Sequence, residues 1–76
     1  MNSLERKRIQ QKLGNRVREL RHKKQWSQEH FADMCNMHRG HMGQIERGES
    51  NLTLASMVAM ALKLGIRVGQ LFKGIA

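Results

Sequence analysis

The stretch CNMHRGHMGQIERGESN, residues 35–51, decides the fold of this 76-residue chain. Its central part predicts a helix that begins near His38 and ends at Gly48, because glycine favours the left-handed conformation that follows a helix. Two glycines, Gly40 and Gly43, fall inside this helix, where each costs about 1 kcal/mol relative to alanine. A helix that keeps both glycines must have a reason other than its own stability.

A second short helix precedes this stretch. Ser27 is a good N-cap, and Gln28 and Glu29 follow in the first turn. The helix is expected to end near Asn36, a residue type that tolerates the left-handed conformation. Because only about three residues join the two helices, they must cross steeply. This geometry predicts a helix-turn-helix over about residues 27–47.

Three further helical segments complete the expected fold. An apolar stripe predicts a helix over residues 5–24, and its members are Ile9, Leu13, Val17 and Leu20. Thr53 starts a helix that is apolar on much of its circumference, which predicts a central position. A short helix near residues 68–73 follows. The prediction is one all-α domain over residues 1–76, a five-helix bundle with a basic segment at 1–12 and C-terminal helices over 53–73.

Charge and composition narrow the function. The net charge is +8, and residues 1–24 hold nine basic and two acidic side chains, so an anionic partner such as nucleic acid is expected. No run of about 18 apolar residues and no signal peptide is recognised, and one cysteine fits a reducing compartment, so a cytoplasmic protein without a membrane partner is expected. No catalytic constellation is present, which predicts that the protein is not an enzyme.

Four segments resemble the Xre-type helix-turn-helix family, which includes the lambda-like phage repressors and Cro proteins. They are LGNRVRELR (13–21), WSQEHFAD (26–33), GQIERGESN (43–51) and ALKLGIRVGQLF (61–72). The combination MHRGHM…IERGESNLTL also resembles the controller proteins of restriction–modification systems. The resemblance implies a sequence-specific transcriptional regulator that binds double-stranded DNA as a homodimer on an inverted-repeat operator, without a cofactor. RNA polymerase would be a further partner of an activator.

Two other functions stay open at this point. A phage-type or chromosomal repressor of the same family would have the same features. A non-specific basic nucleic-acid-binding module would explain the charge of the first segment, although RNA readers usually offer more stacking aromatics than Phe31, Phe72 and Trp26.

The helix after the turn is expected to read DNA bases. At about 100° per residue its outward face carries arginine, glycine and glutamine side chains. Arg can donate two hydrogen bonds to guanine, and Gln can pair with adenine. The predicted base-reading residues are Arg39, Gly40, His41, Gly43 and Gln44. The two glycines would leave a bare strip for close approach to base edges, although Arg39 as a phosphate contact is an alternative.

The resemblance also assigns supporting roles. Backbone phosphates are expected at Ser27, Gln28, Arg47, Ser50 and Asn51. A buried ion pair is expected between Arg21 and Glu46.

Two expectations come from the residues themselves. Apolar character near the C-terminal end predicts a dimer interface at Val68, Leu71, Phe72 and Ile75, with packing inside one subunit as the alternative. Cys35, His38 and His41 are spaced like soft metal ligands, but a free cysteine is most often a small core residue, so no metal is predicted. A metal- or redox-responsive regulator through Cys35 is a third possibility.

Overall fold

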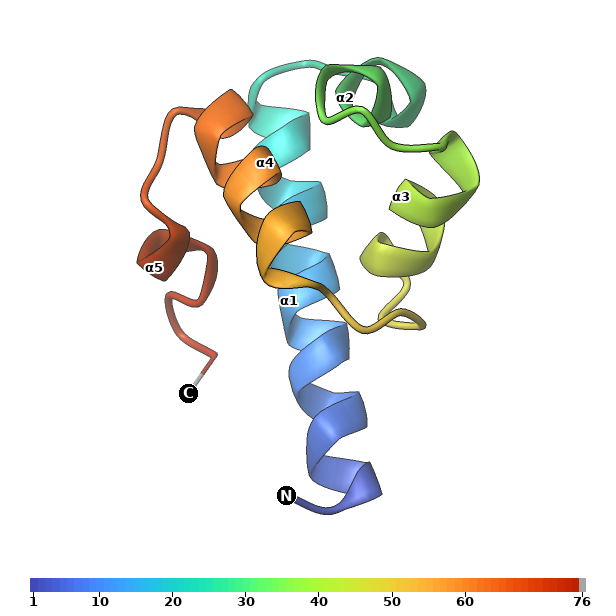
Figure 1. Cartoon of the computed structure of the whole chain (residues 1–76). Helices are drawn as coiled ribbons and strands as arrows, with labels where there is room; N and C mark the ends of the chain where they lie inside the picture. The colour runs from blue at the N-terminus through green and yellow to red at the C-terminus, as the bar shows by residue number, and fades with distance from the viewer. Residues whose placement is uncertain (76) are drawn as a thin grey trace.

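The computed structural model describes residues 1–75, which form five helices and no strand (Figure 1). The helices are α1 (Ser3–Lys23), α2 (Gln28–Met34), α3 (Arg39–Glu46), α4 (Leu54–Leu64) and α5 (Val68–Leu71). The prediction of an all-α fold with five helices is confirmed. None of the helices in this part of the chain combines the length and apolar character needed to cross a membrane.

The helix ends follow the capping residues that the sequence offers. Ser27 Oγ accepts a hydrogen bond from the backbone N–H of His30 at 3.0 Å, and this caps α2. Thr53 caps α4 in the same way, and Asn36 has a φ of 60° after α2. His38 stands at the N-cap of α3 without a side-chain hydrogen bond to it. The turn therefore owes its shape to Asn36 and to packing, not to a strong cap on α3.

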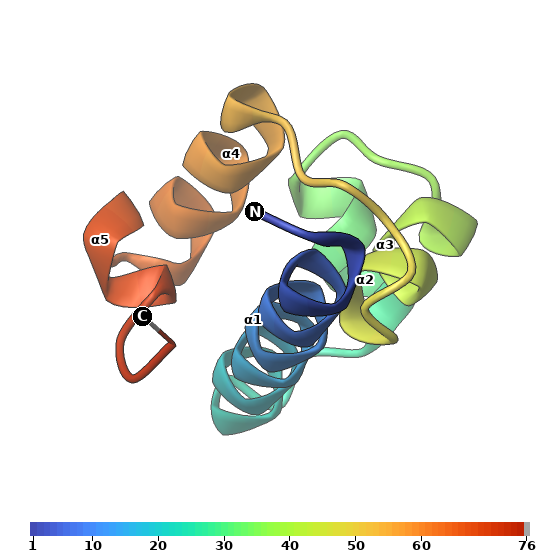
Figure 2. The same cartoon turned by 90° about the horizontal axis from the view of Figure 1, so that it is seen from below.

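The core lies between the five helices, and α1 runs along its length (Figures 1 and 2). Its fully buried apolar side chains come from every helix: Val17, Phe31, Met42, Met60 and Leu71. Trp26 stacks on Phe31 with 5.6 Å between ring centroids and anchors the connection between α1 and α2. Core filling is thus the role of the buried methionines.

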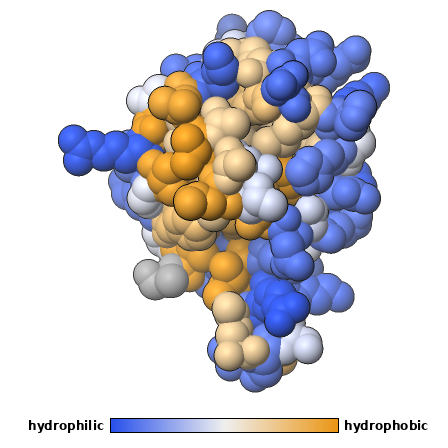
Figure 3. Space-filling model, viewed as in Figure 1, coloured by the Kyte–Doolittle hydropathy of each residue, from blue (hydrophilic) through white to orange (hydrophobic). Residues whose placement is uncertain are grey.

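The expectation that α4 is central is wrong on one of its faces. Leu54, Val58 and Leu62 remain 68%, 38% and 72% exposed, and their spacing of four residues places them in one stripe. Figure 3 shows apolar side chains gathered over α4 and α5. A helix can carry apolar residues around most of its surface and still bury only one side within a single subunit.

The expected dimer interface near the C-terminal end is wrong at Leu71. This side chain is completely buried in the core of the subunit, so it has no surface to offer a second copy. Val68, Phe72 and Ile75 are half-buried and pack against the same core. The alternative of packing within one subunit therefore describes Leu71.

Two glycines let α3 lie close against α1. A Cβ added at Gly14 would sit 2.7 Å from the backbone oxygen of Glu46 and would also collide with the backbone oxygen of Ile45. A Cβ added at Gly48, whose φ is +74°, would sit 2.7 Å from Cα of Gln11. The end of α3 thus packs directly on the backbone of α1. This contact fixes the distance between the two helices.

Candidate nucleic-acid interface

One side of α3 is packed and the other is open. Met42, Ile45 and Glu46 are at most 2% exposed and face the rest of the subunit. Arg39, Gly40 and Gln44 are exposed. No heavy atom of the described residues outside the helix's own backbone lies within 4 Å of a Cβ added at Gly40, so this position is bare surface. The open side of α3 therefore presents two polar side chains that can donate hydrogen bonds, with the bare backbone of Gly40 between them.

The structure corrects the prediction for Gly43 and places His41 elsewhere. Gly43 is buried, and a Cβ there would lie 3.1 Å from Arg47 Nη1 and 3.4 Å from Gln28 Oε1. These side chains cover it, so the strip of two open glycines is wrong at Gly43. His41 is half-buried, and its Nε2 lies 3.5 Å from Ser50 Oγ. The imidazole thus turns toward the loop that follows α3.

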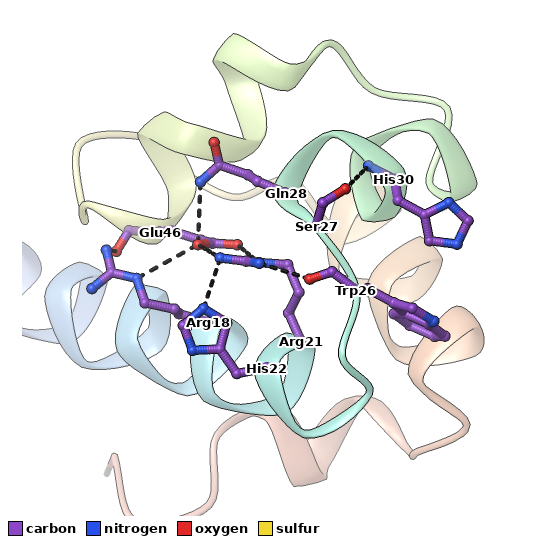
Figure 4. Close-up of polar contacts among 8 residues, drawn as sticks. All are labelled: Arg18, Arg21, His22, Trp26, Ser27, Gln28, His30 and Glu46. Atoms are coloured by element: carbon purple, nitrogen blue, oxygen red, sulfur yellow. Dashed lines mark hydrogen bonds and ion pairs between the residues drawn. The ribbon is translucent and has the colours of Figure 1, made fainter.

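Behind the open face, the ion pair between Arg21 and Glu46 is present (Figure 4). Arg21 Nε donates to Glu46 Oε2 at 2.7 Å and Arg21 Nη2 donates to Oε1 at 2.9 Å, which is a bidentate geometry. Both side chains are nearly excluded from solvent, at 10% and 1% exposure. Arg21 Nη1 also donates to the backbone oxygen of Trp26 at 2.8 Å. The pair therefore ties α1, the connection before α2, and the end of α3 together.

Two further side chains complete the environment of Glu46. Gln28 Nε2 donates to Glu46 Oε1 at 3.2 Å, and Arg18 Nε lies 3.5 Å from the same oxygen. Burial by itself would raise the pKa of Glu46, but the hydrogen bonds from Arg21 and Gln28 and the charges of Arg21 and Arg18 outweigh it, so the pKa is lowered. Glu46 is accordingly ionised at neutral pH. Through its hydrogen bond from Gln28 it links the end of α3 to the start of α2.

The residues predicted to meet phosphates fall into two groups. Ser27 and Gln28 lie at the start of α2, where Ser27 caps the helix and Gln28 donates one amide hydrogen to Glu46. A carboxamide has a second donor hydrogen, which remains for an anion. Gln28 Oε1 also lies beside Gly43, so the start of α2 and the outer side of α3 meet at Gln28.

The second group lies in the loop after α3. Arg47 Nε pairs with Glu49 Oε2 at 3.1 Å, and both side chains are more than half exposed, so the pair is weak and screened by salt. Asn51 accepts a hydrogen bond from Gln10 of α1. The loop is thus fastened to α1 at Asn51, while Arg47 remains on the surface with an acidic neighbour.

Cys35 and the nearby histidines do not form a ligand cluster. Within residues 1–75 no group of three or more His, Cys, Asp or Glu side chains could hold a metal ion. Cys35 is buried, and burial raises the pKa of its thiol to about 11, against a smaller lowering by the charge of Lys63. The thiolate form, which binds metals and reacts with oxidants, is therefore a minor species of Cys35 at neutral pH.

Reading the sequence alone missed the residues that seat α3 on α1. Gly14 and Gln11 receive the end of α3 and the following glycine, and Arg18 donates to the backbone oxygen of Glu46 at 3.2 Å. The available signal was a glycine in the interior of a long helix, which usually marks a close approach of backbones. Such a signal does not say which partner approaches.

The arrangement of α2 and α3, with a buried support and an open second helix, defines the helix-turn-helix class of DNA-binding proteins. Comparison with known families agrees, because the helix-turn-helix family model HTH_3 matches residues 17–71. The chain belongs to this family. The protein is therefore a DNA-binding regulator of transcription, and its class is not one of enzymes.

Several relatives carry more specific names. The chain is 35% identical over 63 residues to control protein C.SmaI of Serratia marcescens, covering 83% of this chain and 75% of that protein. It is 34% identical over 68 residues to control protein C.MunI of a Mycoplasma species, covering 88% and 92%. The crystal structure of the restriction–modification controller protein C.AhdI of Aeromonas hydrophila matches with a TM-score of 0.80 and 39% identity, covering 82% and 94%.

Proposed function

We propose that the protein is a controller of a restriction–modification system that binds an inverted-repeat operator as a homodimer. The open face of α3, with Arg39 and Gln44 on either side of bare Gly40, carries the proposal, because these are side chains that can read base edges. The names of C.SmaI, C.MunI and C.AhdI favour the controller function. A phage-type or chromosomal repressor with the same α3 is the alternative.

In this proposal Gln28 and the loop after α3 hold the two phosphate backbones beside the major groove. Gln28 would offer its second amide hydrogen, and Ser50 and Asn51 would contact phosphates from the other end of α3. Arg47 would have to leave Glu49 for a phosphate, which their exposed and weak pairing allows. His41 would take no base contact, because its ring is turned toward Ser50.

Selection of binding sites from random double-stranded DNA tests the proposal. Two copies of α3 about 34 Å apart require half-sites about 10 bp apart, centre to centre, so the enriched sequences should form an inverted repeat. A single unpaired half-site would contradict the homodimer, and the absence of any enriched motif would contradict sequence-specific binding. The second result would favour the non-specific basic module.

Arg39→Ala is expected to relax base preference at one position of each half-site. An arginine that donates two hydrogen bonds to guanine contributes about 1–3 kcal/mol of discrimination, which corresponds to roughly 5- to 150-fold. The measurement is the affinity for the selected operator and for its single-base variants. Arg8→Ala removes the same side chain from an exposed position on α1 and should leave the ranking of sequences intact. Uniform weakening by Arg39→Ala across all sequences would make Arg39 a phosphate contact instead.

The exposed stripe of α4 is the proposed dimer interface. Leu54, Val58 and Leu62 form an apolar surface that a second copy could cover about a twofold axis. The flanking half-buried side chains of Val68 and Phe72 would extend it, while Leu71 would support it from within. This surface keeps Val68 and Phe72 of the interface predicted from the sequence, but Leu71 is buried beneath it.

Leu62→Glu is expected to convert the dimer to a monomer and to weaken operator binding at least tenfold, because a charge would be buried without a partner. Sedimentation velocity and DNA titration measure the two effects. Leu4→Glu is the matched control for sedimentation, since Leu4 is 66% exposed and Leu62 is 72% exposed, but Leu4 lies on α1. A Leu62→Glu protein that still sediments as a dimer would place the interface elsewhere.

A further inference from the structure

The face of α1 that packs against α3 extends toward the N-terminal end of α1, past the last residues that contact α3 and its loop. Four positions of this face touch α3 or the loop after it, at spacings of three, four and three residues. They are Gln11 against Gly48, Gly14 against Ile45 and Glu46, Arg18 on the backbone oxygen of Glu46, and Arg21 on its carboxylate. These spacings define one stripe along the helix.

The next position of the stripe toward the start of α1 is Lys7. It stands four residues before Gln11, which is about 6 Å along the helix axis. Lys7 is exposed, and no carboxylate of residues 1–75 forms an ion pair with it. In Figure 1 the first turns of α1 project past the rest of the molecule, on the side where the loop after α3 meets the helix. Lys7 therefore lies about one turn before the α1 residues that contact the loop.

This position points to an anion next to the loop. Gln10 hydrogen-bonds to Asn51, so the loop contacts α1 about one turn after Lys7. Residues 1–12 carry Arg6, Lys7, Arg8 and Lys12 against the one acidic residue Glu5. DNA presents an unbroken row of phosphates, so a strand that touches the loop continues past it. The match to the family model begins at residue 17, within α1, so Lys7 lies before the matched residues.

We propose that Lys7 binds a DNA phosphate next to those met by residues 47–51, and that the projecting turns of α1 thereby lengthen the contacted segment of each half-site. The inference rests on the proposed function, because it needs DNA on the open face of α3. Lysine acts there as a point charge on a flexible stem, which suits a phosphate and carries no base preference.

Lys7→Gln and Lys12→Gln form a matched pair for the test. Both remove one positive charge from an exposed position of α1, but Lys12 lies about 140° around the helix from Lys7. Affinity for the selected operator is measured from low to high salt. For Lys7→Gln the slope of log K against log salt should shrink by about 0.9 for each phosphate that the variant no longer neutralises. The Lys12→Gln slope should stay at the wild-type value, and the ranking of operator sequences should not change in either variant.

The outcomes separate this inference from the function beneath it. Equal slopes for Lys7→Gln, Lys12→Gln and wild type would overturn the phosphate contact while leaving operator binding established. Equal reductions in both variants would also overturn it, because general attraction by the basic segment would then explain the effect. Failure of the wild-type protein to prefer any sequence would instead overturn the proposed function itself.

Discussion

Glu46→Gln is expected to lower the free energy of unfolding by about 3–5 kcal/mol, because it leaves the buried guanidinium of Arg21 without its counter-charge. The amide oxygen can still accept hydrogen bonds, but in either orientation the NH₂ group faces a donor nitrogen of Arg21. Native domains have only about 5–15 kcal/mol of stability in total. The substitution should therefore unfold a large fraction of the protein on mild heating.

Glu19→Gln is the matched control for this result. It makes the same chemical change in a carboxylate that is 58% exposed and pairs with Lys23 at 3.6 Å. An exposed pair of this kind contributes about 0–1 kcal/mol, so the control should melt close to the wild-type temperature. For a domain of this size each kcal/mol moves Tm by about 4–8 °C. Equal Tm values for Glu46→Gln and Glu19→Gln would show that the buried pair does not hold the fold.

The same pair predicts how the difference between wild type and Glu46→Gln depends on pH. The pKa of Glu46 is lowered from its ordinary value of 4.5 in the folded state, so its contribution to stability is fully present above that value. The contribution is lost as the pH falls through the lowered pKa. The gap in unfolding free energy between wild type and the variant should therefore narrow in acid.

Gly14→Ala is expected to destabilise the fold by about 1–3 kcal/mol despite the better helix propensity of alanine. The new Cβ would lie 2.7 Å from the backbone oxygen of Glu46. Backbone atoms cannot rotate away as a flexible side chain can, so α3 would have to move off α1. Urea unfolding measures the destabilisation, and operator affinity should fall with it because α3 changes its position.

Gly40→Ala is the opposite case on the same two helices. Its Cβ would meet no heavy atom of the described residues within 4 Å beyond its own helix, so the variant should gain up to about 1 kcal/mol from helix propensity. Operator binding should weaken if DNA approaches the bare backbone at Gly40. A destabilised Gly40→Ala, or a Gly14→Ala as stable as wild type, would contradict the packing described for these two positions.

Local signals in the sequence were sufficient for the elements that they govern. Ser27 and Thr53 start helices because their hydroxyls satisfy backbone N–H groups close by in the chain. Asn36, Gly48 and Gly65 end helices because their residue types accept a positive φ. The apolar period of α1 and the short turn before α3 then leave few ways to pack, and the resemblance to the helix-turn-helix family pointed to the same fold.

Contacts between distant segments could not be read in this way. Gly43 lies on the outer side of a helical wheel, yet Gln28 and Arg47 cover it, because where neighbouring elements send their side chains is not a property of α3. Leu71 and Leu62 look alike in sequence, but the first is completely buried and the second is 72% exposed. A wheel gives the direction of a side chain relative to its own helix and nothing of what lies opposite.

By itself the sequence determined the number and type of the helices, the turn between α2 and α3, and Arg39 and Gln44 as exposed side chains. These follow from interactions within a few residues, which capping, propensity and periodicity describe. Only the tertiary structure decided that Gly40 is open and Gly43 covered, that α4 keeps an apolar stripe outside, and that Gly14 seats α3 on α1. Each of these depends on the distance between backbones far apart in the chain, and packing of the whole core sets that distance.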